Sequence, residues 1–263
     1  MGGFWQTIPS LLLASFALAQ CTASDSSPDH QSGKPRIQLM TSLPLVWGEG
    51  VSMQSILAGG ADPAPIYRYW QSHYDIMAVD SLENLAEQDP DIVILAQPRA
   101  MDPADLSDLD DWVRAGGAVI ILTDPELVWP SALPLGDPQR PLASGLLSPL
   151  LAHWGLELVA DGDNKAGFVD IRTGGFSFIT KGAGKFERIS DKAAPDVRCK
   201  LGADDFIVRC RVGQGHAIMV ADADFLHAAL WPESARLTPG KSDAVRFVDS
   251  LVLGHFDPDD LRK

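Results

Sequence analysis

The stretch DIVILAQPRAMDPADLSDLDDWVRAGGAVIILTD, residues 91–124, decides the fold of this chain. It contains two short apolar runs, Ile92–Ala96 and Ala118–Leu122, with the continuous hydrophobicity of strands buried on both faces. Between them, Asp102 and Pro103 are suited to begin a helix, and a pair of glycines is suited to end it. Two buried strands joined by one helix form a right-handed parallel βαβ unit. The stretch therefore predicts an α/β protein whose open, mostly parallel sheet is flanked by helices.

The composition is that of a folded chain with an acidic surface. The 263 residues are 46% hydrophobic and include seven Trp, which is enough for a substantial core. The formal net charge of −14 argues against nucleic acid and against anionic membrane surfaces as partners. We expect the acidic surface to serve solubility.

The N-terminus has the features of an export signal. Residues 1–20 carry no charged side chain and hold an apolar core too short for a normal membrane span, which predicts a signal peptide. The sequence LAQC ending at Cys21 resembles a bacterial lipobox, which predicts lipidation of Cys21; cleavage after Ala19 is the alternative. Residues 21–35 are rich in Ser, Asp and Pro and predict a flexible linker. We expect an exported protein of the cell envelope, anchored to the membrane through Cys21 and facing the periplasm.

The two remaining cysteines flank a predicted hairpin. If residues 203–206 form a four-residue loop, Cys199 falls directly opposite Cys210, and a cross-strand disulfide can form in an oxidising compartment. The alternative is two separate buried thiols. Because the register of a hairpin is uncertain by a residue or more, both alternatives stay open.

The rest of the chain is interpreted as a single α/β domain over residues 36–263. Further regular elements are expected at residues 36–41 (strand), 74–80 (strand), 216–221 (strand of the main sheet) and 242–253 (helix). Residues 125–141 hold five prolines and predict a long ordered loop. Between about 165 and 215, alternation at period two predicts a β-rich insertion of antiparallel strands with tight turns.

The order of these segments resembles a known family. The stretch at 91–124, followed by LLSPLLAHWGLEL at 146–158 and GHAIMVADADFL at 215–226, is similar to the auxiliary, gliding-type component family of uncharacterised ABC transport systems. The resemblance implies a fold similar to class I glutamine amidotransferases, with the related flavodoxin-like arrangement of the sheet. It also implies a domain without catalytic activity, whose partners are ABC transporter subunits or other envelope proteins.

The motifs of several enzyme classes are missing from the sequence. The strand ending at Leu122 is followed by Thr123, Asp124 and Pro125, whereas catalytic amidotransferases place a nucleophilic cysteine at that elbow. There is no G-x-S-x-G elbow and no P-loop. The six histidines lack metal-ligand spacing, so we predict neither a metal site nor a cofactor.

The candidate binding residues follow from the predicted sheet, because ligands of open α/β sheets bind outside the carboxyl ends of the parallel strands. The polar, charged and aromatic side chains expected there are Trp47, Glu49, Arg99, Asp124, Asp222 and Asp224, with Ser42 and Gln97 beside them. Together they suit a polar ligand such as a sugar or a peptide. In a purely structural alternative, Arg99 pairs with Asp124 in a salt bridge between loops. In the same alternative, Asp222 and Asp224 cap a helix that begins near Phe225.

These observations favour a non-catalytic accessory or binding component of a bacterial envelope ABC-type transport system. The main alternative is a periplasmic hydrolase that uses Asp222 and Asp224 as acid and base. A structural envelope protein that contacts a partner is the third possibility.

Overall fold

The computed structural model describes residues 1–3, 33–162, 167–189 and 193–254. The chain divides into two units, Met1–Gly33 and Lys34–Lys263, and all regular elements described below belong to the second. The predicted signal peptide beyond residue 3, Cys21 and nearly all of the predicted linker lie outside the described residues.

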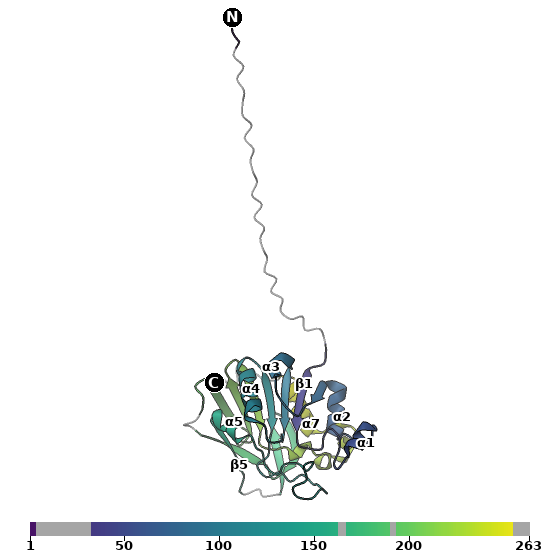
Figure 1. Ribbon diagram of the computed structural model, residues 1–263. Helices are drawn as coiled ribbons and strands as arrows, with labels where there is room; N and C mark the ends of the chain where they lie inside the picture. The colour runs from purple at the N-terminus through teal and green to yellow at the C-terminus, as the bar shows by residue number, and fades with distance from the viewer. Residues whose placement is uncertain (4–32, 163–166, 190–192, 255–263) are drawn as a thin grey trace. The chain divides into compact units, whose positions relative to one another are not determined.

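A seven-stranded sheet with the order β2-β1-β3-β4-β11-β10-β9 forms the centre of the second unit (Figure 1). Its strands are β1 (Arg36–Thr41), β2 (Asp75–Ala78), β3 (Ile92–Ala96), β4 (Ala118–Leu122), β9 (Val197–Gly202), β10 (Ile207–Val212) and β11 (Gly215–Val220). The strands from β2 to β11 in this order are mutually parallel, and β10 and β9 continue the sheet antiparallel. The chain runs from β1 to β2 on one side and then crosses to β3 on the other, as in doubly wound sheets.

The opening stretch forms the predicted βαβ unit. β3 and β4 pair in parallel from Val93 opposite Val119 onward, and both strands are buried after their first residue. Between them, α4 (Pro103–Arg114) buries its apolar face through Leu109, Trp112 and Val113. Asp102 is the N-cap residue of α4 and has an extended backbone. The expectation that its side chain would cap the helix is wrong, because that side chain makes no capping hydrogen bond.

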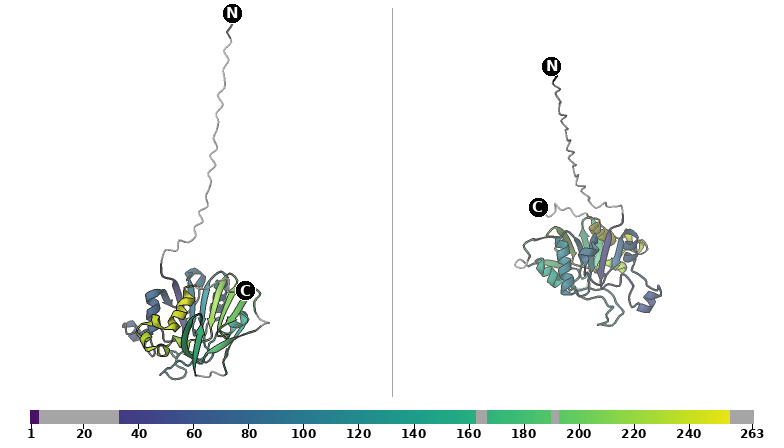
Figure 2. Two further views of the ribbon diagram at one scale, coloured as in Figure 1. Left: turned by 180° about the vertical axis from the view of Figure 1, so that it is seen from behind. Right: turned by 45° about the horizontal axis from the view of Figure 1, so that its top comes forward.

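Helices cover both faces of the sheet. They are α1 (Met53–Leu57), α2 (Pro65–His73), α3 (Leu85–Gln88), α4, α5 (Ser148–His153), α6 (Glu233–Arg236) and α7 (Asp243–Val252). Figure 1 shows α3, α4 and α5 in front of the sheet, and the view from behind in Figure 2 shows α7 on the opposite side. There Phe247 of α7 packs with its ring centroid 5.3 Å from that of Phe178 and 6.0 Å from that of Phe225. Within the described residues, no helix combines the length and the hydrophobicity that crossing a membrane requires.

Antiparallel strands fill the region after α5. β5 (Leu156–Ala160) pairs with β8 (Gly184–Arg188), and β6 (Phe168–Thr173) pairs with β7 (Phe176–Lys181), each as a separate two-stranded sheet. The stretch expected to be β-rich, about 165 to 215, is thus divided among three sheets, because β9 and β10 join the central one. The predicted fold class is confirmed as a mixed α/β architecture with a large, mostly parallel sheet, flanking helices and antiparallel strands.

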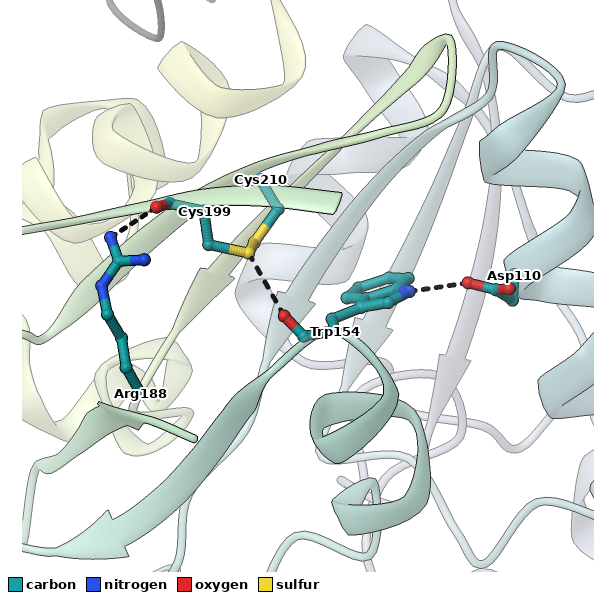
Figure 3. The surroundings of a disulfide bond; sticks show 5 residues. All are labelled: Asp110, Trp154, Arg188, Cys199 and Cys210. Atoms are coloured by element: carbon teal, nitrogen blue, oxygen red, sulfur yellow. Dashed lines mark hydrogen bonds between the residues drawn. A yellow bond between two sulfur atoms is a disulfide. The ribbon is translucent and has the colours of Figure 1, made fainter. Parts of the chain in front are cut away.

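A disulfide bond joins Cys199 of β9 to Cys210 of β10 (Figure 3). The two residues lie directly opposite each other in the antiparallel register, because residues 203–206 form the connection between the strands. The sulfur of Cys199 lies 3.7 Å from the carbonyl oxygen of Trp154, whose indole N–H donates to Asp110 of α4 at 2.6 Å (Figure 3). The bond therefore lies where the antiparallel edge of the sheet meets the segment after α5.

Candidate ligand pocket and buried aspartates

The topological switch point of the sheet lies at β1, since β2 and β3 flank it on opposite sides. A pocket of about 170 Å³ opens at the carboxyl ends of these three strands. Its polar, charged and aromatic lining consists of Thr41, Ser42, Trp47, Asp80, Arg99 and Gln139. This is the position at which open α/β sheets bind ligands.

Hydrogen bonds between neighbouring loops fix the floor of this pocket. The hydroxyl of Ser42 donates to the carbonyl oxygen of Gln97 at 2.6 Å and accepts from the backbone N–H of Leu142 at 3.2 Å. The hydroxyl of Thr41 donates to the carbonyl oxygen of Ala96 at 2.6 Å. The loops after β1 and β3 are therefore held to each other and to the Pro-rich loop at residues 125–145.

Trp47 is held at the mouth of the pocket by its backbone. Its carbonyl oxygen accepts from the N–H of Asp62 at 3.3 Å, and the next residue, Gly48, has a φ of +85°. A Cβ atom on Gly48 would meet the carbonyl oxygen of Asp62 at 2.9 Å, so glycine is needed for this approach. The indole is left half exposed, at 50%, which makes it available to a ligand.

Two opposite charges line the pocket. Arg99 follows β3, and Asp80 follows β2 on the other side of β1; both are exposed. Among the described residues, neither side chain makes an ion pair or a hydrogen bond. Sequence reasoning named Trp47 and Arg99 but missed Asp80, which was assigned to the end of the strand predicted at 74–80, whereas β2 ends at Ala78.

The three predicted aspartates form a buried cluster that is separate from this pocket. Asp124 follows β4, while Asp222 and Asp224 follow β11, and their exposed fractions are 0%, 0% and 1%. Both carboxylate oxygens of Asp222 accept from the hydroxyl of Thr180 at 2.7 Å. Asp224 accepts from the backbone N–H of Val128 at 2.7 Å. None of the three aspartates lines the pocket at the switch point.

Burial raises the pKa of each carboxyl in this cluster. Desolvation is the largest cause, and it raises the pKa of Asp124 to about 8 and that of Asp224 to about 6. It also raises the pKa of Asp222 well above its ordinary value, and repulsion from Asp124 adds to this. The hydrogen bond from Val128 lowers the pKa of Asp224, as does the charge of Lys181, and so limits the rise. The cluster therefore keeps protons at a pH at which exposed aspartates have lost them.

Glu49 has a third location. Its carboxylate accepts from the backbone N–H of Ala132 at 3.1 and 3.3 Å, and so fastens the Pro-rich loop. It lines a second pocket, of about 190 Å³, together with Trp129 and His227, whose rings meet edge to face with centroids 4.6 Å apart. The structure thus divides the six predicted residues among three places.

The structural alternatives for these residues have different outcomes. The proposed salt bridge between Arg99 and Asp124 is not formed: the arginine is exposed, whereas the aspartate is fully buried. The predicted caps are formed only in part: Asp222 accepts from the N–H of Phe225 at 3.2 Å in the 3-10 turn Asp224–Leu226, but the N-cap residue of this turn is Ala223, and Asp224 accepts from Val128 instead. Within the described ranges, no group of three His, Cys, Asp or Glu residues could hold a metal ion.

Fold and site together define a doubly wound α/β protein with an open polar pocket at its switch point. The chain belongs to the family described as ABC-type uncharacterized transport system, which matches residues 34–166. The family name indicates an auxiliary component of such a system. No curated protein sequence matches the chain.

Similar solved structures include the mmIFT52 N-terminal domain, at 12% identity and a TM-score of 0.48, with 84% of this chain and 98% of that chain covered. The exo-beta-1,4-mannosidase Op5Man5 from Opitutaceae bacterium strain TAV5 has 13% identity and a TM-score of 0.45, over 83% of this chain and 36% of that one. Cytoplasmic Protein STM3548 from Salmonella typhimurium has 11% identity and a TM-score of 0.40, over 83% and 98%. Likenesses at this level say nothing about what the present chain does.

Proposed function

We propose that this protein is a non-catalytic, ligand-binding accessory component of a bacterial envelope ABC-type transport system. The open pocket at the switch point is the observation that carries the proposal. Its side chains Trp47, Asp80 and Arg99 offer an aromatic surface and two opposite charges without internal ion pairs among the described residues. The match to the transport-system family supplies the context in which such a binding site would act.

The hydrolase alternative has less support. Acid and base catalysis requires carboxyl groups that a substrate can reach within hydrogen-bond distance. Asp222 and Asp224 are 0% and 1% exposed, and their oxygens accept from Thr180, Phe225 and Val128. These contacts give both carboxylates a structural role, and a substrate would have to displace protein to reach them.

The proposal includes export and a lipid anchor on Cys21, on the strength of the N-terminal sequence. The disulfide between Cys199 and Cys210 supports an oxidising compartment, since such bonds persist outside the cytosol. A single acyl chain binds a membrane only marginally, so the anchor would need several chains or a bound partner. The amidotransferase-like fold that the resemblance implies stays a prediction and carries no part of the proposal.

The test is recovery of partners from envelope extracts after mild crosslinking, with Cys21→Ser as the parallel variant. We expect ABC transporter subunits to be recovered with the wild-type chain and to be depleted with the variant. Asp224→Asn is the matched control for the hydrolase alternative, and we expect it to recover the same subunits. Recovery of no transporter subunit by any of the three proteins would overturn the accessory role.

A further inference from the structure

We propose that the pocket at the carboxyl ends of β1, β2 and β3 binds a small zwitterion with the charge pattern and size of a single α-amino acid. This inference rests on the proposed function, because it names the ligand of that binding site. Three features carry it: the volume of the pocket, the two charges in its wall, and the apolar side chains that also line it.

The volume sets the size of the ligand. The pocket measures about 170 Å³, close to the roughly 150 Å³ cavity that holds one benzene molecule in an engineered protein. Pockets for drug-sized ligands are larger, at roughly 300–1,000 Å³. A single amino acid matches this volume, whereas most of an oligosaccharide or of a folded peptide segment would extend out of the pocket into solvent.

The charges set the chemistry. Among the residues that the structure describes, Arg99 and Asp80 are the only ionisable side chains in the lining, and they have opposite signs. A carboxylate can accept two parallel hydrogen bonds from a guanidinium, and an ammonium donates to a carboxylate, both as charge-assisted bonds. A ligand with one charge would satisfy only one of the two residues. A zwitterion satisfies both, and a neutral sugar offers a charge to neither.

The remaining lining suits an aliphatic side chain. Val46, Val51 and Ile56 line the pocket beside the half-exposed indole of Trp47. An aliphatic group placed against them removes apolar surface from water, which is favourable in proportion to its area. The ligand class is therefore a free amino acid with an apolar side chain, and L-leucine is the natural probe.

The test uses probes that differ by one charge. Binding of L-leucine to the full chain is measured by calorimetry against 4-methylpentanoate, which lacks the ammonium, and 3-methylbutylamine, which lacks the carboxylate. D-glucose tests a neutral sugar. Because each one-charge analogue lacks one of the two charge-assisted bonds, we expect it to bind at least about tenfold more weakly than L-leucine, which corresponds to about 1.4 kcal/mol.

Two variants assign the charges to their residues. In Arg99→Gln, L-leucine should lose its advantage over 3-methylbutylamine but keep its advantage over 4-methylpentanoate. In Asp80→Asn the pattern should reverse. The matched controls are Arg172→Gln and Asp111→Asn, which remove exposed charges outside the pocket, and both should bind L-leucine as the wild-type chain does.

The outcomes separate this inference from the proposed function. The proposal of a zwitterionic ligand would be overturned if D-glucose bound saturably and L-leucine did not. It would also be overturned if the affinity for L-leucine fell equally in the pocket variants and in the controls. The absence of L-leucine binding altogether would overturn it as well. If transporter subunits are still recovered in that case, the ligand class is wrong and the accessory role stands. If L-leucine binds and no subunit is recovered, the accessory role fails.

Discussion

Replacement of Asp224 by asparagine should remove a pH dependence from the stability of this protein. Asp224 is 1% exposed, and its pKa rises from 3.8 to about 6, chiefly through desolvation. The folded chain therefore binds this proton more tightly than the unfolded chain does, so protonation favours folding. Its contribution to stability is fully present below pH 4 and is lost as the pH rises through 6.

The size of the effect follows from the two pKa values. One pKa unit corresponds to about 1.36 kcal/mol, so the full rise in pKa corresponds to about 3 kcal/mol, of which about 2 kcal/mol should be lost from the free energy of unfolding between pH 4 and pH 8. Asp124, with a pKa of about 8, should extend the loss to higher pH. Burial lowers the pKa of His216 and His227, and these residues act in the opposite direction up to about pH 6.5. The wild type alone would therefore show a mixed curve.

The difference between wild type and Asp224→Asn removes the contributions of the histidines. Loss of the charge at residue 224 also lowers the pKa of Asp124 and of Asp222, which shifts the difference in the same direction. Asparagine can still accept the hydrogen bond from the N–H of Val128, so the loop contact is kept. Urea denaturation at constant ionic strength should show the variant gaining about 2 kcal/mol relative to wild type between pH 4.5 and pH 8. A difference that stays constant with pH would refute the raised pKa, and one that changes in favour of wild type would refute its direction.

Two further predictions concern stability. Replacing Cys199 and Cys210 by alanine opens a loop with a sequence separation of 11, and it should lower the free energy of unfolding, measured by denaturation, by about 3 kcal/mol. A reductant should destabilise the wild type and leave the variant unchanged. Gln97→Met keeps the volume of a fully buried side chain but removes the bonds of its amide to the backbone of Asp124 (2.8 and 3.2 Å) and Leu142 (3.0 Å). It should cost at least about 2 kcal/mol, and an unchanged denaturation midpoint would contradict this.

The βαβ unit was predictable because local signals and burial agree there. Ile92–Ala96 and Ala118–Leu122 are continuous apolar runs, and the structure gives both strands these bounds. The late strand at 216–221 was also recognisable, since only a strand in the centre of a sheet is apolar throughout. The strands that pair with it in the sheet could not be predicted, because strand pairing depends on contacts between residues far apart in the sequence.

The candidate site was predictable only in part. Because Trp47 and Arg99 follow predicted strands, the sequence placed them at the carboxyl edge of the sheet. In the structure they line one pocket. The same argument placed Asp124 and Asp224 at that edge, but it could not tell which strand ends a loop would cover. Their burial depends on the path of the Pro-rich loop, whose backbone N–H at Val128 bonds Asp224. No periodic pattern in the sequence encodes that path.

One loop connects the buried aspartates to the open pocket. Residues 125–145 are fastened to the cluster by Asp224, to the loop after β1 by Glu49, and to Ser42 through the N–H of Leu142. Gln139 of the same loop lines the pocket. Asp224 therefore holds in place a loop that forms part of the pocket wall, although it does not reach the pocket itself. Of the two carboxylates that resemble a catalytic pair in the sequence, Asp224 thus supports the loop beside the proposed binding site, whereas Asp222 binds Thr180 and Phe225.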